Sequence, residues 1–209
     1  MERVIVSVAL GYLLGAIPFS LIAGKLTRGI DLREHGSGNL GAANTFRTLG
    51  AGPGLVVLSL DAGKGAAGVA AAALLWRGSV GLGRTDLMLL AGLAAVAGHI
   101  WTVFASFKGG KGVATAAGVF AAIAPLAFVI CLAVWLAAVS VSRYISLGSV
   151  LAAVCLPMAV YLTSSARTAD WQRVFWVSLL VAAVVVARHR GNISRILRGN
   201  ERKFSLRGG

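Results

Sequence analysis

The sequence predicts an all-α integral membrane protein with seven transmembrane helices and short cytoplasmic glycine-rich loops. Its residues are 57% hydrophobic and only 13% charged, whereas a soluble domain carries roughly a quarter charged residues. Mean hydropathy is +0.82, and apolar runs close to the length of a membrane span recur along the chain. No polar linker or low-complexity segment divides the chain, so a single domain over residues 1–209 is expected.

The first apolar run covers residues 4–24 and begins like a signal peptide. It is too long for one and lacks the small-residue cleavage pattern, so we expect it to remain as the first span. Gly11 and Gly15 form a G-x-x-x-G pattern in it, which predicts close packing against another helix. The later apolar runs cover residues 54–76, 87–106, 113–142, 145–163 and 172–187.

The run 113–142 is too long for one straight span. Its 30 residues would extend ~45 Å as a helix, against a hydrocarbon core of ~30 Å. Pro125 lies near its middle, where proline removes a backbone hydrogen bond and breaks or kinks a helix. Two short spans, about 113–124 and 126–142, are therefore expected, which brings the total to seven.

Seven spans with the N-terminus outside place four polar regions on one side of the membrane. These regions contain fourteen Lys and Arg residues, against five on the other side. The positive-inside rule therefore predicts that they face the cytoplasm. The four regions are residues 25–53, 107–112, 143–144 and 188–209.

The stretch "GSGNLGAANTFR", residues 36–47, fits the G-x-G-x-x-G pattern of dinucleotide-binding proteins. That function requires a preceding strand in a βαβ unit and an acidic residue about 20 positions on. Here the stretch follows "IDLREH" and is soon followed by the next apolar run, so this function is not favoured. The glycine amides could still cradle an anion beside a helix N-terminus. Ser37 and Asn39 lie in the stretch, and Asn44 and Arg47 share a helix face. A flexible loop between spans is the alternative.

The stretch "GHIWTVFASFKGGKGVAT", residues 98–115, has a second glycine-rich turn. It lacks the GK[ST] ending of a nucleotide-binding P-loop. Lys108 and Lys111 flank Gly109 and Gly110, which predicts a phosphate cradle at a helix start; lysines that only snorkel at the membrane edge are the alternative. His99 lies inside the third span, where it faces a cavity or partner, or is a structural histidine.

The tail "RHRGNISRILRGNERKF", residues 188–204, has a polar face at the point where the last span ends. On a helix, Arg188, Asn192 and Arg195 lie at i, i+4 and i+7, and His189 lies three residues from Asn192. Attraction to anionic lipid would explain the arginines alone. It would not explain the histidine and the asparagine.

Two smaller features accompany these segments. "DAGKG" places Asp61 and Lys64 at i and i+3 inside the second span, which favours either a structural ion pair or a catalytic role. "SRYISLGS" places Arg143 at the same cytoplasmic edge. Cys131 and Cys155 lie in apolar runs and are expected to act as small hydrophobes, without a disulfide or a metal.

Together these segments resemble the acyl-phosphate-dependent glycerol-3-phosphate acyltransferase family of bacterial membranes. The match runs in order over nearly the whole chain, and the motifs are long and specific. Ala43 departs from the family motif, which more often has threonine there. The resemblance implies transfer of a fatty acyl group from acyl phosphate to the 1-hydroxyl of sn-glycerol 3-phosphate, giving 1-acyl-glycerol 3-phosphate (lysophosphatidic acid) and phosphate. This is the first step of phospholipid biosynthesis, at the inner (plasma) membrane with the active site facing the cytoplasm.

The resemblance also implies roles for individual residues. Ser37, His189 and Asn192 would be catalytic. Glycerol 3-phosphate would bind to Ser37, Asn39, Asn44, Arg47 and Lys108. Acyl phosphate would bind to Gly109, Gly110, Lys111, Gly112 and Arg143. Asp61, Lys64, His99 and Arg195 would support the site. No metal, cofactor or nucleic acid is implied; the partners are the two substrates and membrane lipid.

The residues suit this chemistry in their own right. Two phosphates side by side repel each other strongly at low dielectric, so a site for both needs several cations. Thioester-dependent acyltransferases commonly carry H-x-x-x-x-D, and none of His35, His99 and His189 has an aspartate five residues on. Acyl phosphate is already activated, so a phosphate oxygen of the donor could take the hydroxyl proton. The alternative class is an organic-phosphate transporter, although no inverted repeat is visible.

Overall fold

The computed structural model describes residues 1–78, 82–163 and 168–204, and every regular element among them is a helix. The all-α prediction is thereby confirmed. The backbone separates into two compact units, residues 1–123 and residues 124–205, and each is described by itself below. Arg167 and Arg207, two of the cations in the charge count, lie outside the described residues.

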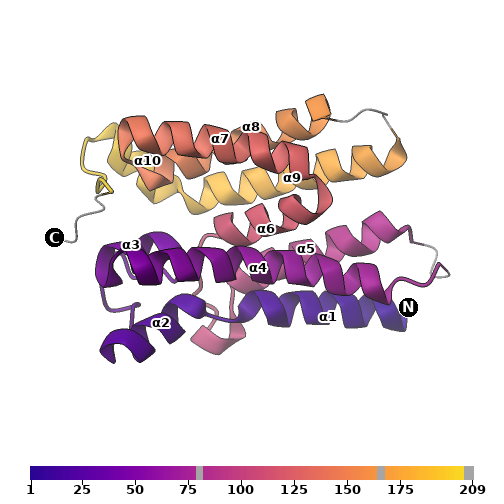
Figure 1. Cartoon of the computed structure of the whole chain (residues 1–209), viewed down its shortest axis with the longest axis horizontal. Coiled ribbons are helices and arrows are strands. Elements are labelled where there is room, and N and C mark those ends of the chain that lie inside the picture. Colours follow the sequence, from indigo (N-terminus) through magenta and orange to yellow (C-terminus); the bar gives the residue numbers. More distant parts are fainter. Residues whose placement is uncertain (79–81, 164–167, 205–209) are drawn as a thin grey trace. The chain divides into compact units, whose positions relative to one another are not determined.

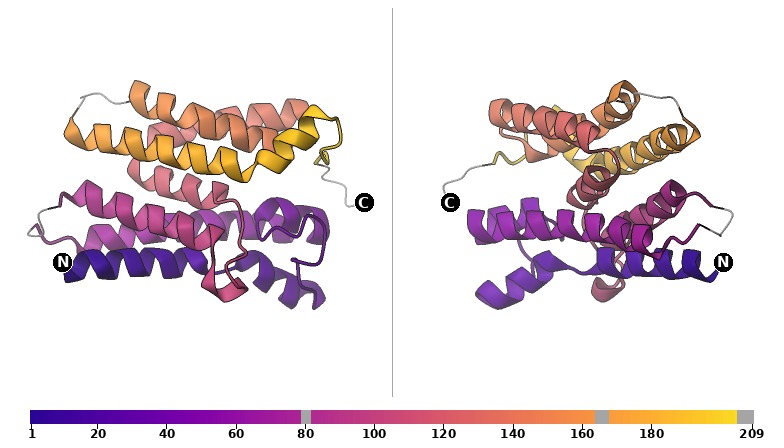
Figure 2. Two further views of the ribbon diagram at one scale, coloured as in Figure 1. Left: turned by 180° about the vertical axis from the view of Figure 1, so that it is seen from behind. Right: turned by 45° about the vertical axis from the view of Figure 1, so that its right-hand side comes forward.

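Unit 1 is a bundle in which α1 packs against α4 and α5, while α4 also packs against α3 and α6 (Figure 1). Seen from behind, α5 runs alongside α1 (Figure 2). The elements of this unit are α1 Glu2–Ala16, α2 Phe19–Arg28, α3 Ala42–Leu49, α4 Ala51–Leu75, α5 Arg84–Ile100, the 3₁₀ turn η1 Val103–Ala105, and α6 Val113–Ile123.

Small residues allow these helices to approach closely. A Cβ on Gly11 or Gly15 of α1 would collide with the backbone of Ala91 or Ala95 of α5, so the packing role predicted for this pattern is confirmed. Helices α4 and α6 meet in the same way, because a Cβ on Gly118 would collide with the carbonyl of Ala62. Lipid tails are as apolar as the side chains they contact, so tight packing is what holds such helices together.

The first apolar run is broken at Pro18, a feature that we did not predict. Helix α1 ends at Ala16, and α2 begins at Phe19. Backbone carbonyls freed by such a break need protein partners within a membrane. The hydroxyl of Thr102 donates to the Ala16 carbonyl, and Lys64 Nζ donates to the Ile17 carbonyl at 2.8 Å.

Unit 2 contains α7 Pro125–Ser142, α8 Ile145–Thr163, α9 Ala169–Arg188 and α10 Arg190–Leu197. Helix α8 packs between α7 and α9, and the short α10 contacts both α8 and α9. Pro125 occupies the first turn of α7, and α6 ends two residues earlier. Proline is tolerated there because its missing N–H has no partner in a first turn. The predicted division of the long apolar run is therefore confirmed.

Six helical stretches among the described residues are long and apolar enough to cross a membrane. Helix α6 corresponds to the fourth predicted span, about 113–124, and has only 11 residues, or about 16 Å at 1.5 Å per residue. The predicted count of seven is therefore approximate: six of the described stretches are long enough to span, and the remaining helix, α6, is short and packs on α4 and α5.

Candidate functional site

The residues predicted to act in the site fall into two groups, one in each unit. Unit 1 holds Ser37, Asn39, Asn44, Arg47, Asp61, Lys64, His99, Lys108, Gly109, Gly110, Lys111 and Gly112. Unit 2 holds Arg143, His189, Asn192 and Arg195. In unit 1 they lie mainly on the loop between α2 and α3 (residues 29–41, the first loop), on α3, and on the loop between α5 and α6 (residues 101–112, the second loop).

One apolar cluster lies beneath both loops. Leu32 and Leu40 of the first loop are buried together with Leu49 of α3 and Ala105 of the second loop. Leu40, Leu49 and Ala105 are each within three residues of a predicted binding side chain along the chain, and Leu32 is five residues before Ser37. A Cβ on Gly110 would also lie 2.7 Å from the Leu40 carbonyl oxygen. The structure therefore brings together the two glycine-rich segments that the sequence singled out.

Asn44 holds the first loop in shape. Its side chain is buried, with Oδ1 accepting a hydrogen bond from the Ser37 amide at 2.8 Å. Its Nδ2 donates to the carbonyls of Leu32 and His35, each at 3.1 Å. Asn44 thus presents Ser37 at the exposed surface of the loop, and direct contact between Asn44 and a ligand stays a prediction. Arg47, one turn further along α3, is half-buried.

Two of the glycine amides in the motif of the first loop are used within the protein. Gly38 donates its amide to the His35 carbonyl, and Gly41 donates to Asn39, both at 3.1 Å. Gly36 has φ 64°, and a Cβ there would collide with Asn44 Oδ1. Glycine is required at position 36 because of this left-handed conformation and close approach. This reason for the glycine is different from the predicted amide cradle.

An exposed ion pair also braces the first loop. Arg33 Nη2 lies 2.6 Å from Asp31 Oδ2, and the Arg33 amide donates to Asp31 Oδ1 at 2.9 Å. The hydrogen bonds from Arg33 lower the pKa of the Asp31 carboxyl from 3.8 to about 2. Both side chains of the pair are consequently charged throughout the neutral pH range.

The second loop folds back onto the end of α5. The amides of Gly109 and Gly110 donate to the carbonyls of Ile100 and His99, at 3.1 and 3.0 Å. The last carbonyls of a helix lack intrahelical donors, and these bonds satisfy two of them. We predicted that both amides would line an anion cradle; instead they bond within the protein, so an amide nest does not explain glycine at these two positions.

The same loop carries strained backbone next to its first lysine. Ser106 and Phe107 have φ of 53° and 60°, a region that residues other than glycine rarely adopt. Phe107 is held there by an amide hydrogen bond to the Thr102 carbonyl at 2.8 Å. Lys108 follows with an exposed side chain, Lys111 is half-buried, and α6 begins directly after Gly112. Both cations are thus carried on a backbone with a defined conformation.

A buried polar cluster lies in the bundle of unit 1. Lys64 Nζ is 2.8 Å from Asp61 Oδ1, and His99 Nδ1 is 3.5 Å from the same oxygen. The predicted ion pair between Asp61 and Lys64 is therefore present. The search for H-x-x-x-x-D missed the pairing of His99 with Asp61, because these residues are 38 positions apart and only the packing of α4 on α5 brings them together.

Unit 2 contains a second buried cluster, centred on Glu201. Its Oε1 accepts hydrogen bonds from Ser146 Oγ at 2.8 Å and Asn192 Nδ2 at 2.6 Å, and its Oε2 accepts from Arg195 Nε at 2.7 Å. The cluster joins the segment after α10 to the start of α8. The Phe204 amide adds a bond to the Arg143 carbonyl at 2.6 Å.

Sequence reasoning missed Glu201, although a signal was available. It is the only acidic residue in the basic segment 188–209, and a lone acid among arginines often has a structural partner. Burial would raise the pKa of this carboxyl, but the hydrogen bonds from Asn192, Ser146 and Arg195 outweigh that effect and lower it. Glu201 therefore remains a carboxylate and fixes the orientation of the Asn192 amide.

His189 lies at the junction of α9 and α10 and is 3% exposed. Its Nδ1 is 2.8 Å from the Val185 carbonyl oxygen. A carbonyl can only accept, so Nδ1 carries a hydrogen and, in a neutral ring, Nε2 is the basic nitrogen. The partner of His189 Nδ1 is thus a carbonyl in its own helix, not a carboxylate.

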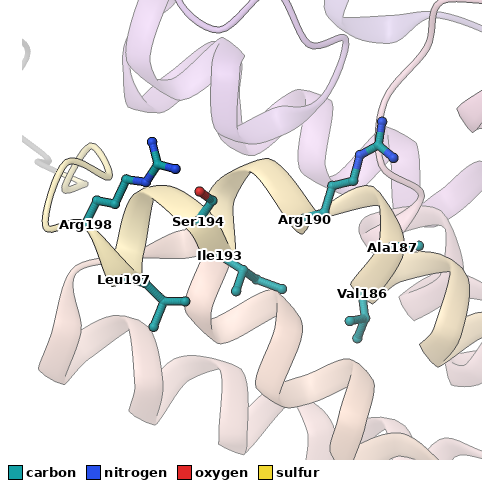
Figure 3. A pocket seen from close by; sticks show the side chains of 7 residues that line it. All are labelled: Val186, Ala187, Arg190, Ile193, Ser194, Leu197 and Arg198. Atoms are coloured by element: carbon teal, nitrogen blue, oxygen red, sulfur yellow. The ribbon is translucent and has the colours of Figure 1, made fainter.

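An open groove runs along α9 and α10, and it combines apolar side chains with arginines (Figure 3). In this view the Arg190 and Arg198 guanidinium groups extend from the same side of the helix. The groove is lined by Val186, Ala187, Arg190, Ile193, Ser194, Leu197 and Arg198. Such a lining suits an amphiphile with a negative head and an apolar chain. In the described part of the chain, no group of three or more His, Cys, Asp or Glu side chains is placed to hold a metal ion.

Comparison with known proteins identifies the family. The sequence profile of the family described as glycerol-3-phosphate acyltransferase matches residues 5–199. A glycerol-3-phosphate acyltransferase of Trichlorobacter lovleyi is 46% identical over 198 residues, covering 94% of this chain and 95% of the relative.

The fold is similar to crystal structures of PlsY (YgiH), described as an integral membrane glycerol 3-phosphate acyltransferase. Its glycerol 3-phosphate form matches with a TM-score of 0.85 and 36% identity, covering 97% of this chain and 96% of that one. Its lysophosphatidic acid form matches with a TM-score of 0.83 and 35% identity over the same shares. The profile, the close relative and the shared membrane fold agree: the chain belongs to the glycerol-3-phosphate acyltransferase family, as an integral membrane enzyme of the PlsY type.

Proposed function

We propose that this acyltransferase uses acyl phosphate as its donor and transfers the acyl group to the 1-hydroxyl of sn-glycerol 3-phosphate. The hydroxyl oxygen attacks the carbonyl carbon, the bond from that carbon to the phosphate oxygen breaks, and inorganic phosphate leaves. The product is 1-acyl-sn-glycerol 3-phosphate (lysophosphatidic acid), and the reaction is the first step of phospholipid biosynthesis.

The observation that carries this proposal is the environment of His189. An acyltransferase that activates its acceptor with a histidine–carboxylate pair needs the carboxylate at the far ring nitrogen. The Nδ1 of His189 faces a main-chain carbonyl instead. An activated donor with a good leaving group fits such a site, because positioning and charge stabilisation then suffice.

We assign the side chains of unit 1 to the phosphates. Ser37, Asn39, Arg47 and Lys108 would bind glycerol 3-phosphate, with Asn44 holding the loop that presents Ser37. Lys111 and the start of α6 would bind the phosphate of the donor, since a helix N-terminus favours an anion. Hydrogen bonds to charged groups contribute ~1.5–3 kcal/mol each.

We assign His189 and Asn192 of unit 2 to the same reaction. His189 would orient the acceptor hydroxyl or polarise the reacting carbonyl, while Arg143 would contribute positive charge toward the acyl phosphate. A phosphate oxygen of the donor would take the hydroxyl proton. Loss of turnover in His189→Ala with normal binding of both substrates would instead make this histidine the base.

The active site is proposed to face the cytoplasm at the inner (plasma) membrane of a bacterium. Support comes from the excess of basic residues in the four polar regions, fourteen against five. The second loop, Arg143 and α10 all belong to these regions. A cytoplasmic site would also have direct access to water-soluble glycerol 3-phosphate.

The test is a donor comparison with the purified protein in lipid. Palmitoyl phosphate, palmitoyl-CoA and palmitoyl-acyl carrier protein are each supplied with sn-glycerol 3-phosphate, and lysophosphatidic acid and free phosphate are measured. Product from acyl phosphate alone is expected. Arg173→Ala, which removes an exposed arginine paired with Asp170 on α9, serves as the control variant.

Two results would contradict the proposal. Product from a thioester and none from acyl phosphate would mean that the donor assignment is wrong. No product from any donor, together with accumulation of labelled glycerol 3-phosphate in sealed vesicles, would favour transport.

A further inference from the structure

We propose that Asp61 and His99 act as a positioning pair for the second loop, setting the conformation in which it offers Lys111 to the donor phosphate. This inference rests on the proposed function, because it concerns how that site recognises acyl phosphate. The starting observation is that three ionisable side chains, Asp61, Lys64 and His99, are each at most 6% exposed in the unit 1 bundle.

Burying these ionisable groups costs free energy, so their presence in the bundle calls for a specific reason. Ionisable side chains within membrane helices are rare and mark functional sites. Lys64 has a structural task already, since it pairs with Asp61 and also donates to the Ile17 carbonyl at the Pro18 break. A lysine and an aspartate would be sufficient for that task. The histidine at 3.5 Å from the same carboxylate oxygen needs a separate reason.

The reason lies on the other side of the ring. His99 Nδ1 faces Asp61, while Nε2 lies against Gly110, where a Cβ would collide with it. The His99 carbonyl meanwhile accepts the Gly110 amide at 3.0 Å. Main chain and side chain of one residue thus contact the centre of the second loop. The contacts form a continuous path from Asp61 through the imidazole ring to Gly110.

A shift of the His99 ring would act on the second loop chiefly at Gly110. It lies two residues after Lys108 and one before Lys111, and it also abuts the Leu40 carbonyl of the first loop. The loop has no side chain of its own at positions 109 and 110 to fill space below it. The imidazole ring therefore fills the space beneath the loop, and the Asp61 carboxylate, with Oδ1 3.5 Å from Nδ1, is placed to orient the ring by charge.

The geometry argues against His99 as the base of the reaction. A base must come within hydrogen-bond reach of the substrate hydroxyl, directly or through one water. The His99 side chain is 5% exposed, with its two nitrogens directed at a carboxylate and at the backbone of Gly110. It is assigned as a positioning residue that acts through the loop.

The experiment compares His99→Ala with His99→Asn in the acyl-phosphate assay. Asparagine can place its Nδ2 near the position of imidazole Nδ1 and keep a donor toward Asp61, but it cannot exchange a proton at neutral pH. For His99→Ala we expect the KM for palmitoyl phosphate to rise about 10–100-fold, since a displacement of the order of 1 Å can cost that much. The kcat should change less than about threefold, and the KM for glycerol 3-phosphate should rise less than the donor KM. His99→Asn should recover most of the lost donor affinity.

Two controls separate positioning from general destabilisation. Val160→Ala removes buried volume from α8 in unit 2 and should lower thermal stability in detergent without raising the donor KM. Asp61→Asn keeps the shape of the carboxylate and removes its charge, so it should shift the donor KM in the same direction as His99→Ala. If His99→Ala does not fold, the comparison of Asp61→Asn with His99→Asn still tests the pair.

The outcomes are distinct. A collapse of kcat with an unchanged donor KM, equally deep in His99→Ala and His99→Asn, would make His99 a base and overturn the inference. An unchanged donor KM in folded His99→Ala, or in folded Asp61→Asn, would overturn it as well. If the wild-type enzyme does not use acyl phosphate at all, the proposed function fails instead. The wild-type measurement in each assay reveals this outcome.

Discussion

The two groups of candidate residues, one in each unit, are held in place by different means. In unit 1, the loops are fixed by many small contributions: backbone hydrogen bonds, glycines in close contact, an apolar cluster and the Asn44 amide. In unit 2, one carboxylate holds the polar side chains, because Glu201 accepts hydrogen bonds from three of them. A single change should therefore cost less in the distributed arrangement than in the central one.

Removal of Glu201 should therefore have the largest effect. In Glu201→Ala, the hydrogen bonds to Ser146, Asn192 and Arg195 are lost together, and the buried Asn192 amide loses its acceptor. We expect kcat/KM to fall about 100-fold or more, since misplacement of a reacting group can cost that much. The measurement is steady-state kinetics on detergent-purified protein, with a thermal melt of each variant.

Glu201→Gln is the matched variant for this prediction. It keeps one oxygen as an acceptor for Ser146 and Asn192 and turns a donor toward Arg195, so an intermediate loss is expected. Activity of Glu201→Ala close to that of the wild type would show that unit 2 is not organised around this carboxylate.

Substitution of Gly110 is expected to have the next largest effect, through the backbone of unit 1. A methyl group at position 110 would collide with the His99 ring and the Leu40 carbonyl, so the second loop must shift. Catalytic efficiency should fall about 10–100-fold, chiefly through the donor KM. Kinetics with varied palmitoyl phosphate would measure this.

Gly52→Ala is the control for this substitution. Gly52 lies in α4 with nothing within 4 Å of an added Cβ, and alanine in a helix is favoured by about 0.5–1 kcal/mol over glycine. Activity should remain normal and thermal stability should not fall. Equal losses in both glycine variants would mean that the collision at Gly110 is not the cause.

The smallest effect is expected at the exposed ion pair of the first loop. The Asp31 pKa is lowered from 3.8 to about 2, so its stabilising effect is fully present above about pH 4 and disappears as pH falls through 2. Asp31→Asn should therefore change activity by less than about twofold, by a constant ratio between about pH 5.5 and 9, since exposed pairs contribute little. A ratio that varies across this range would mean that Asp31 has another titrating partner.

The sequence predicted the fold better than the contacts within the site. The spans follow from hydropathy, and the break before Pro125 follows from the length of its run together with proline chemistry. The helix-breaking effect of proline, applied to Pro18, would also have predicted the break between α1 and α2. The two glycine-rich segments that lie together in unit 1 were also singled out, because their glycines, lysines and asparagines form long specific motifs; substrate binding by them stays a prediction.

The missed contacts depend on packing between distant parts of the chain. No local pattern joins Asp61 to His99, and only the approach of α4 to α5 does so. The amides of Gly109 and Gly110 were predicted to receive an anion. In the structure they donate to the last carbonyls of α5. Glu201 was overlooked because the arginines around it dominate the tail.

The break at Pro18 has a consequence for the order in which this protein is made. The Ala16 carbonyl receives its hydrogen bond from Thr102, 86 residues later in the chain. At a synthesis rate of about 5–20 residues per second, that donor leaves the ribosome roughly 4–17 s after its acceptor. The N-terminal segment therefore enters the membrane before it can take its final form. Its completion waits for the hairpin formed by the second and third spans, so a nascent chain truncated before Thr102 lacks this contact and should be a preferred substrate for membrane quality control.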